Sequence, residues 1–271
     1  MLCWPHIAAD AIGLREIAAA WSLVLAGREA EVPPMLSFQN DPMSTAGRDP
    51  GFQERHFQQD ILLERLWLIF WGLRYLLDTW FWPKMEPRGI VLSREAVQRL
   101  KDAAIASLPE EEGGGKPFIS NGDVISAWIA SMTASVLPST SRRTVIISNA
   151  MDLRDRAPSL FRASAEQGSY VQNALLPVST VLPAQQLFPN DGGLGPAALA
   201  VRRSIDIQGQ EGQVHALARL DRRSLADVGI PPVFGDTSSF FCHSIKLDQS
   251  SDVRQSGLRA CCRQSTIWQS P

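Results

Sequence analysis

The chain has 271 residues, of which 45% are hydrophobic and 20% are charged, and its formal net charge is −2. This composition excludes an intrinsically disordered protein and a nucleic-acid binder that depends on bulk positive charge. At about 100–200 residues per domain, the length predicts one large domain or two small ones.

The beginning of the chain and its cysteines bear on the compartment. The opening apolar run is too short for a secretory signal and has no basic region before it, since the first cation is Arg15. We therefore expect a cytoplasmic protein. The cysteines include one adjacent pair and no CxxC motif, which fits neither a disulfide framework nor a zinc site, so we expect reduced thiols and no metal. They are Cys3, Cys242, Cys261 and Cys262.

The first elements in the chain form a strand, turn and helix. Residues 2–7 are apolar and predict a short strand, and a helix pattern covers residues 11–26 and stops at Gly27. Residues 31–57 are rich in Pro, Ser, Asn, Asp, Gly and Gln, which is typical of a linker or long loop.

A Trp-rich stretch over residues 61–82 is the candidate for membrane contact. Its charged residues are Glu64, Arg65, Arg74 and Asp78. The longest run that they leave without a charge is 66–73, far short of the ~20 residues that a membrane span needs. We expect no transmembrane span and favour a helix packed on the protein body over one lying in a membrane interface, because basic residues do not dominate its polar face.

The rest of the chain alternates predicted strands and helices. A strand at 89–92 precedes a helix that Ser93 caps and that runs to about residue 107, and residues 109–117 predict a surface loop. The further elements are a helix at 123–136, a strand at 143–151, a strand region at 170–181 interrupted by Pro177, helices at 195–207 and 213–227, and a strand at 240–247. The order is mixed α and β, without an internal repeat.

His6 is the histidine whose position suggests chemistry. It lies where the apolar run gives way to the helix, and Asp10 follows it in an H-x-x-x-D pattern. A general base needs an imidazole held in one orientation within reach of substrate, which a turn at a strand end provides. Asp10 can orient the ring or fix the turn through an ion pair. On spacing alone, a half-buried structural histidine and an Asp10 that merely caps the helix are favoured. We favour surface or packing roles for the other histidines, His56, His215 and His243.

The segment that holds this motif resembles the HxxxD segment of the BAHD-type acyltransferases, particularly a fungal branch that includes the trichothecene 3-O-acetyltransferases. Three later segments resemble family segments in the same order, namely SNGDVISAWIA at 120–130, MDLRDR at 151–156 and YVQNA at 170–174. The resemblance covers about residues 2–247. It implies an α/β (mixed α+β) protein with an incomplete, chloramphenicol-acetyltransferase-like two-domain fold.

Departures from the family pattern concern both single positions and the ends. Ala11 and Gln172 replace glycines of the pattern, and a DFGWG-like motif near the C-terminus is missing, as is the portion that precedes HxxxD in the family. We therefore expect a chain truncated at both ends. The expected divisions are the end of the first domain at 1–30, the crossover linker with the Trp-rich helix at 31–88, the second domain at 89–248 and an irregular tail at 249–271.

The resemblance implies transfer of an acyl group, in this case acetyl, from acyl-CoA to a hydroxyl of a secondary metabolite, without a metal and without a covalent acyl-enzyme. His6 would act as general base, a role that typically contributes ~10²–10⁴-fold. Asp10 would support the loop by pairing with an arginine of the neighbouring domain, and Arg154 is the candidate. We expect a monomer that acts on a small-molecule alcohol.

Binding groups for the substrate and the co-substrate are less well defined by the sequence. Ser120 and Asn121, at a helix start, are weak candidates for substrate or co-substrate contacts and for oxyanion donors. Arg142 and Arg143 precede a strand and are weak candidates for the phosphates of coenzyme A, although a surface role is favoured for both.

Two other interpretations stay open at this point. One is a fragment related to the condensation domains of peptide synthetases, which share an HHxxxDG motif, although here a single His6 follows Pro5. The other is a catalytically inactive remnant that at most binds a ligand or a partner, as the missing segments suggest.

Overall fold

The computed structural model describes residues 6, 8–36, 41–81, 90–111, 113–165, 168–188 and 193–244. The strand expected at 2–7, apart from His6, and the tail at 249–271 lie outside the described residues. Three of the four thiols lie outside them as well, and the fourth, Cys242, is a buried free cysteine.

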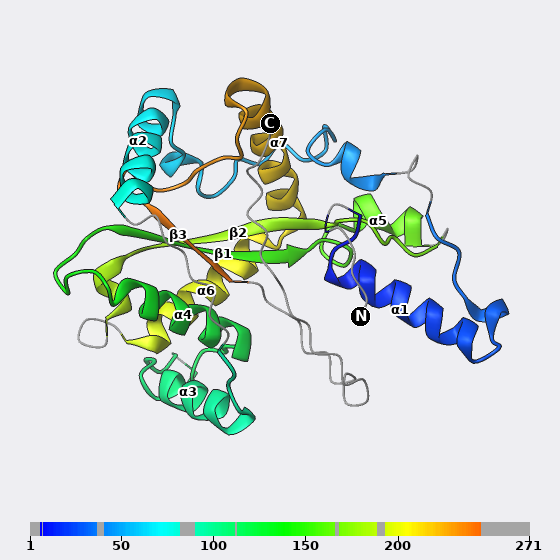
Figure 1. Cartoon of the computed structure of the whole chain (residues 1–271), viewed down its shortest axis with the longest axis horizontal. Helices are drawn as coiled ribbons and strands as arrows, with labels where there is room; N and C mark the ends of the chain where they lie inside the picture. Colours follow the sequence, from blue (N-terminus) through cyan, green and yellow to red (C-terminus); the bar gives the residue numbers. More distant parts are fainter. Residues whose placement is uncertain are drawn as a thin grey trace.

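A three-stranded sheet forms the centre of the fold (Figure 1). Its strands are β1 (Thr144–Asp152), β2 (Leu175–Pro183) and β3 (Phe240–Ser244). The strand order is β2-β1-β3, with β2 antiparallel and β3 parallel to β1. β1 lies in the middle because its β-branched run is buried on both faces of the sheet, as its burial pattern shows.

Pro177 lies within β2, so the expectation that it interrupts the strand was wrong. β2 is the edge strand of the described sheet, and the backbone N–H of Ser179 is bonded to the Gln208 side chain on the outer side of that edge. Pro177, two residues earlier, faces the same side, where a missing N–H costs no ladder hydrogen bond.

Helices cover both sides of the sheet. In chain order they are α1 (Ala11–Leu25), α2 (Arg65–Phe81), α3 (Arg94–Ala106), α4 (Asn121–Ala134), α5 (Pro158–Ala165), α6 (Leu194–Gln208) and α7 (Glu211–Val228). α5 is the helix that the sequence analysis did not predict. The strand predicted at 89–92 was wrong in its described part, because Ile90–Leu92 pairs with no strand there and Val91 is 96% exposed.

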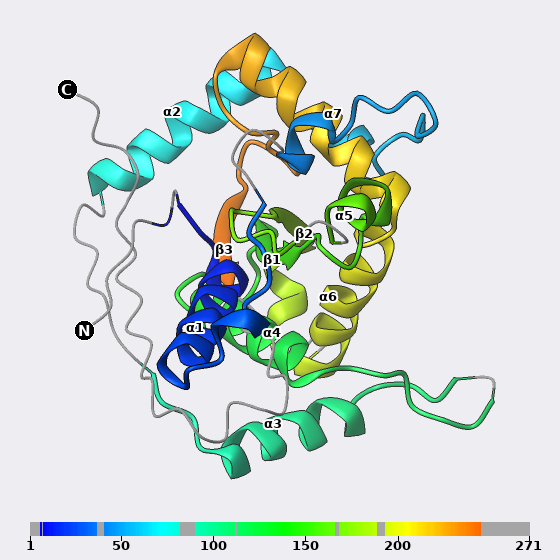
Figure 2. The ribbon, with the colours of Figure 1, turned by 90° about the vertical axis from the view of Figure 1, so that its right-hand side faces the viewer.

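The helices form layers around the sheet (Figures 1 and 2). α4 and α6 contact one face and each other, and α3 packs outside them. α2 and α7 lie on the opposite side, while α1 and α5 lie beyond the end where β1 finishes. The core lies between β1 and the α4–α6 layer, where small side chains such as Ala127 and Ala130 allow close approach to Val145 and Ile147.

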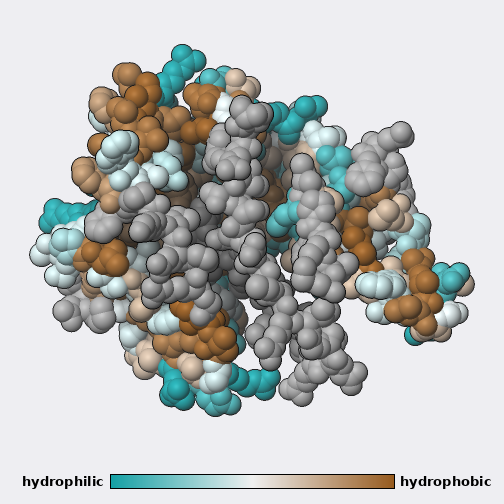
Figure 3. Space-filling view, in the orientation of Figure 1, coloured by the Kyte–Doolittle hydropathy of each residue, from teal (hydrophilic) through white to brown (hydrophobic). Residues whose placement is uncertain are grey.

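The Trp-rich helix α2 packs on the body through one face only. Trp71 donates its indole N–H to the carbonyl of Ser239 at 3.0 Å, and Asp78 pairs with Arg143. The other face exposes large apolar side chains, which Figure 3 shows as a brown surface at the upper left. They are Leu66, Trp67, Ile69, Phe70, Leu73, Leu76, Leu77, Trp80 and Phe81. None of the helices in the described ranges combines the length and the hydropathy required to cross a bilayer.

Candidate active site

Asp10 fixes the start of α1. It is fully buried, and its Oδ1 accepts a hydrogen bond from the backbone N–H of Gly13 at 2.7 Å. This is the N-cap arrangement that satisfies one of the free N–H groups at a helix start. The helix then runs to Leu25, and Gly27, with φ of 71°, follows its end as the sequence predicted.

The carboxylate of Asp10 is also one half of a long-range ion pair. Both Arg154 Nη1 and Arg154 Nη2 lie 3.1 Å from Oδ2, and Nη2 lies 3.1 Å from Oδ1. The backbone N–H of Ala174 donates to Oδ2 at 2.9 Å. These donors and Gly13 occupy both oxygens, so the Asp10 carboxylate contacts the helix start, Arg154 and the backbone of Ala174.

Arg154 joins that loop to a second segment. It follows β1, and its Nε donates to the carbonyl of Tyr170 at 3.0 Å while Nη2 donates to the carbonyl of Gln172 at 2.7 Å. Asp152, two residues before Arg154, accepts from Nη1 at 2.5 Å. One guanidinium therefore connects the end of β1, the start of α1 and the segment 170–174.

Close backbone packing holds the same three parts together. A Cβ built on Gly13 would lie 1.8 Å from the carbonyl oxygen of Val171, so only glycine fits where α1 meets segment 170–174. Asn173 donates from Nδ2 to the carbonyl oxygen of His6 at 2.9 Å. The backbone of His6 is thereby attached to the residue next to Ala174, which itself bonds Asp10.

The side chain of His6 is exposed. Among the described residues, its imidazole has no hydrogen-bond partner. The turn thus combines a backbone held by Asn173 and Asp10 with an imidazole that a solute can reach.

Ser120 and Asn121 begin α4, where Ser120 has a clear structural task. Ser120 Oγ accepts from the N–H of Asp123, and the Asp123 carboxylate accepts from the N–H of Ser120 at 2.7 Å, which makes a capping box. Arg202 donates to the Asp123 carboxylate at 2.6 Å and to Ser120 Oγ at 3.0 Å. Asn121 is exposed. The S-x-x-D pattern of the sequence predicts this capping box, but nothing in the sequence predicts that Arg202 binds Ser120 and Asp123.

Arg142 and Arg143, the candidates for phosphate contact, lie before β1. Arg143 pairs with Asp78 of α2 and donates to the carbonyl of Ser238 at 2.6 Å. Its guanidinium also lies 5.0 Å from the centre of the Phe240 ring. Arg143 therefore joins α2 to the sheet, and Arg142 is exposed.

The structure also contains a Ser–His pair that the sequence analysis did not foresee. Ser159 Oγ lies 3.1 Å from His215 Nε2, a separation found in nucleophile–base pairs. However, His215 Nδ1 accepts the backbone N–H of Gly47 at 3.1 Å, and burial lowers the pKa of His215. The neutral ring consequently carries its proton on Nε2 and donates it to Ser159. This pair is a packing contact and not an activated nucleophile.

Other residues near the turn were missed by sequence reasoning. Tyr170 is buried and donates its hydroxyl to Asp41 at 2.9 Å, and burial raises its pKa above the ordinary value. Its ring also lies 5.6 Å from the Arg154 guanidinium. The YVQNA segment contained Tyr170 and Asn173, but no spacing rule connected either of them to the His6 loop.

Within the described ranges, no cluster of His, Cys, Asp and Glu could hold a metal ion.

Comparison with known proteins adds to this geometry. O-acetyltransferase PaAT-2 of Phomopsis amygdali is 32% identical over 225 residues, which are 79% of this chain and 45% of that protein. Acetyltransferase BOT5 of Botryotinia fuckeliana is 31% identical over 242 residues, which are 88% of this chain and 43% of that protein. The chain thus spans about half the length of these relatives. No protein-family model matches it.

A solved structure has the same fold over the matching part. The crystal structure of F. graminearum TRI101 complexed with ethyl coenzyme A superposes with a TM-score of 0.50 at 14% identity, over 87% of this chain and 48% of that one. The expected mixed α/β acyltransferase fold is therefore confirmed, and this chain matches about half of the solved protein.

Proposed function

Because this chain belongs to a family of fungal acetyltransferases related to trichothecene 3-O-acetyltransferase, and spans about half of their length, we propose that it transfers an acetyl group from acetyl-CoA to a hydroxyl of a small secondary metabolite. The observation that carries the proposal is the H-x-x-x-D turn, with an exposed His6 and a buried Asp10 bound to Arg154. The name of PaAT-2 specifies O-acetyl transfer, the name of BOT5 specifies acetyl transfer, and the neighbouring structure is a complex with ethyl coenzyme A.

In this proposal the chemistry is a direct transfer. His6 removes the hydroxyl proton as the acceptor oxygen attacks the thioester carbonyl, the C–S bond breaks, and the proton passes from the imidazolium to the departing thiolate of coenzyme A. Asp10 and Arg154 are positioning residues, since they contact the turn and not the reacting atoms. The Ser159–His215 pair supplies no nucleophile, which favours a route without an acyl-enzyme.

We propose that the site lies at a junction of two domains. In this proposal α1 and its turn belong to one domain and β1 and segment 170–174 belong to the other, and the contacts of Arg154 with Asp10 and Gln172 support it. Asn121 is the better candidate for contact with substrate or co-substrate, because Ser120 Oγ is engaged by Asp123 and Arg202.

Mass spectrometry of ester products tests this function. The chain is incubated with acetyl-CoA and a panel of polycyclic alcohols, and we expect an acetylated alcohol whose yield disappears in His6→Ala. Arg223→Gln, at an exposed arginine of α7 with no proposed role in this site, serves as the control variant and should retain the product. Ester formation at equal rates with wild type, His6→Ala and buffer would contradict the proposal and leave the inactive remnant as the better description.

A further inference from the structure

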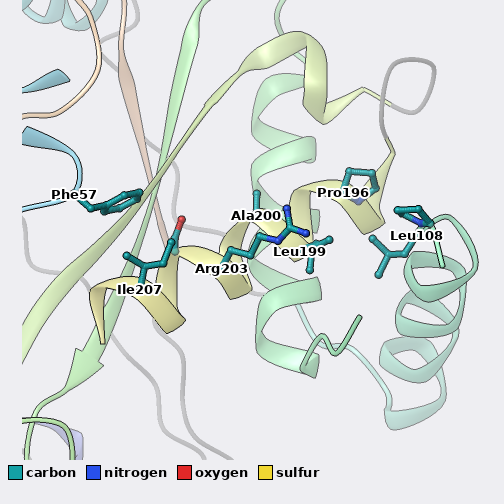
Figure 4. Close-up of a pocket in the computed structure, with 9 residues that line it drawn as sticks. Phe57, Leu108, Pro196, Leu199, Ala200, Arg203 and Ile207 are labelled. Atoms are coloured by element: carbon teal, nitrogen blue, oxygen red, sulfur yellow. The ribbon is translucent and has the colours of Figure 1, made fainter. Parts of the chain in front are cut away.

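A groove runs along the exposed side of α6, away from the His6 turn. It consists of two adjoining hollows of about 480 Å³ and 450 Å³, which share Phe57, Ala200 and Ser204. Figure 4 shows Phe57 and Ile207 at one end of the first hollow and Leu108 and Pro196 at the other. The first hollow has mainly apolar walls over about three turns of the helix, which suits an elongated apolar molecule.

One cation lies in the middle of these apolar walls. Arg203 is exposed, it is the charged residue among those lining the first hollow, and it forms no ion pair within the described part of the chain. Asp60 lines the second hollow, but its carboxylate already pairs with Arg55 at 2.8 Å. An apolar ligand that carries one negative charge is therefore complementary to the groove.

The second hollow provides two buried polar groups without partners. Gln58 is 6% exposed and Thr180 is 2% exposed, and both residues line this hollow. Neither Gln58 Oε1 nor Thr180 Oγ1 has a hydrogen-bond partner among the described residues. A buried polar atom left in this state costs about 1–3 kcal/mol.

The chemistry of these two groups specifies what they would bind. Gln58 Nε2 donates to the carbonyl of Ser179 at 2.8 Å, which fixes the amide orientation and leaves Oε1 as an acceptor. The Thr180 hydroxyl can donate and accept. A ligand hydroxyl would donate to Gln58 Oε1 and accept from Thr180 Oγ1, once a small shift of these two buried side chains admits it.

We propose that this groove is a binding site for an apolar hydroxy acid, with its carboxylate at Arg203, its hydroxyl at Gln58 and Thr180, and its chain along Phe57 and α6. The site is separate from the one described above. Leu182, which lines the second hollow, pairs with Val145 near the start of β1, whereas Arg154 follows Asp152 at the other end of that strand. The seven steps from Val145 to Asp152, at about 3.3 Å per residue, place the two sites roughly 23 Å apart along β1. The inference does not depend on acyl transfer.

Titration calorimetry with the whole chain tests the site. The probes are 3-, 5- and 10-hydroxydecanoate, with decanoate as the probe that lacks the hydroxyl and 1,10-decanediol as the probe that lacks the charge. We expect at least one hydroxydecanoate to bind about 3–10-fold more tightly than decanoate, the gain from one added hydrogen bond at a buried group. Equal binding of decanoate and all hydroxydecanoates, or no binding, overturns the proposal.

Two variants locate the binding. Thr180→Val keeps the shape of the side chain and removes an unpartnered hydroxyl, so we expect a folded protein that no longer distinguishes the preferred hydroxydecanoate from decanoate. Arg203→Gln weakens every carboxylate probe about 5-fold or more and leaves 1,10-decanediol unchanged. Arg223→Gln, at a 78% exposed arginine side chain on α7, is the matched control and leaves all affinities unchanged. Wild-type affinities in both Thr180→Val and Arg203→Gln would overturn the site.

Discussion

The Asp10 carboxylate and the Arg154 guanidinium, 144 residues apart in the chain, form an ion pair in which the Asp10 side chain is fully buried and that of Arg154 is 14% exposed. Asp10→Asn leaves the shape of the turn and removes one of the two carboxylates that pair with Arg154, of which Asp152 is the other. We expect a free energy of unfolding lower by about 2–4 kcal/mol, since a buried ion pair is lost and the amide NH2 group takes the place of an oxygen that accepts hydrogen bonds from Arg154 and backbone N–H groups. Urea denaturation measures this change.

A double-mutant cycle separates the pair from its surroundings. With Arg154→Met as the second change, we expect a coupling energy of at least ~1.5 kcal/mol between the two sites. Glu31→Gln is the control, because the Arg28–Glu31 pair is exposed on both sides and should not change stability measurably. Additive effects of Asp10→Asn and Arg154→Met would mean that the two side chains do not act as a pair.

Gly13 and Gly72 lie in helices but in opposite surroundings. Gly13→Ala places a methyl group 1.8 Å from the Val171 carbonyl oxygen, whereas an added Cβ on Gly72 meets nothing within 4 Å. We expect Gly13→Ala to lower the melting temperature through a forced shift of α1, at a cost of about 1–3 kcal/mol. Gly72→Ala should raise stability by about 0.5–1 kcal/mol. Calorimetric scans of both variants compare them, and an unchanged melting temperature for Gly13→Ala would contradict the packing described here.

Ser120 and Asn121 were predicted as a pair, but their environments differ. Ser120→Ala removes the cap of α4 and a contact with Arg202, and we expect a loss of about 1–2 kcal/mol in unfolding free energy. Asn121→Ala, at the exposed neighbour, should change stability by less than about 0.5 kcal/mol. Equal losses in the two variants, measured by urea denaturation, would argue against the structural task of Ser120.

The helices were the most predictable part of the fold, because their signals are local. The pattern before Gly27 and the cap at Ser93 each fixed a helix end correctly. β2 was harder to predict, since a proline is compatible with a strand only at a sheet edge, and the strand order is a long-range property. The strand prediction at 89–92 was wrong because an apolar run forms a strand only if another strand lies beside it to pair with, which is also a long-range property.

The contact between Asp10 and Arg154 could be predicted, because the resemblance selected the two residues together. The hydrogen-bond network around them could not. No spacing in the sequence connected Asn173 to the His6 carbonyl, or Arg202 to Asp123, because each contact joins segments brought together only by the tertiary fold. The Ser159–His215 contact was missed for the same reason.

His56 makes the stability of the protein pH-dependent. It is 2% exposed and stacks on Phe234 with a ring separation of 5.1 Å, and burial lowers its pKa from 6.5 to about 4. The unfolded chain gains a proton below pH 6.5 while the folded chain does so only near pH 4, so stability is full above pH 6.5 and falls as the pH drops toward 4. Between pH 7 and 5, the titration of His56 should lower the free energy of unfolding by about 2 kcal/mol.

Comparison with His56→Asn isolates that contribution. Asparagine does not titrate, so the unfolding free energy of the His56→Asn variant should fall less between pH 7 and 5 than that of the wild type. The effect of the other buried histidine, His215, is the same in both proteins. Identical pH slopes for wild type and His56→Asn would show that His56 does not remain neutral in the fold.

The proposed role of His6 as general base is tested most directly by chemical rescue. The measured quantity is the rate of thiol release from acetyl-CoA in the presence of an alcohol acceptor, for wild type and for His6→Gly with and without imidazole. The exposed position of His6 leaves room for imidazole to take its place. We predict a ~10²–10⁴-fold loss in His6→Gly and a recovery that rises with the concentration of neutral imidazole. A His6→Gly rate equal to wild type, or a loss that imidazole does not change, would contradict the account.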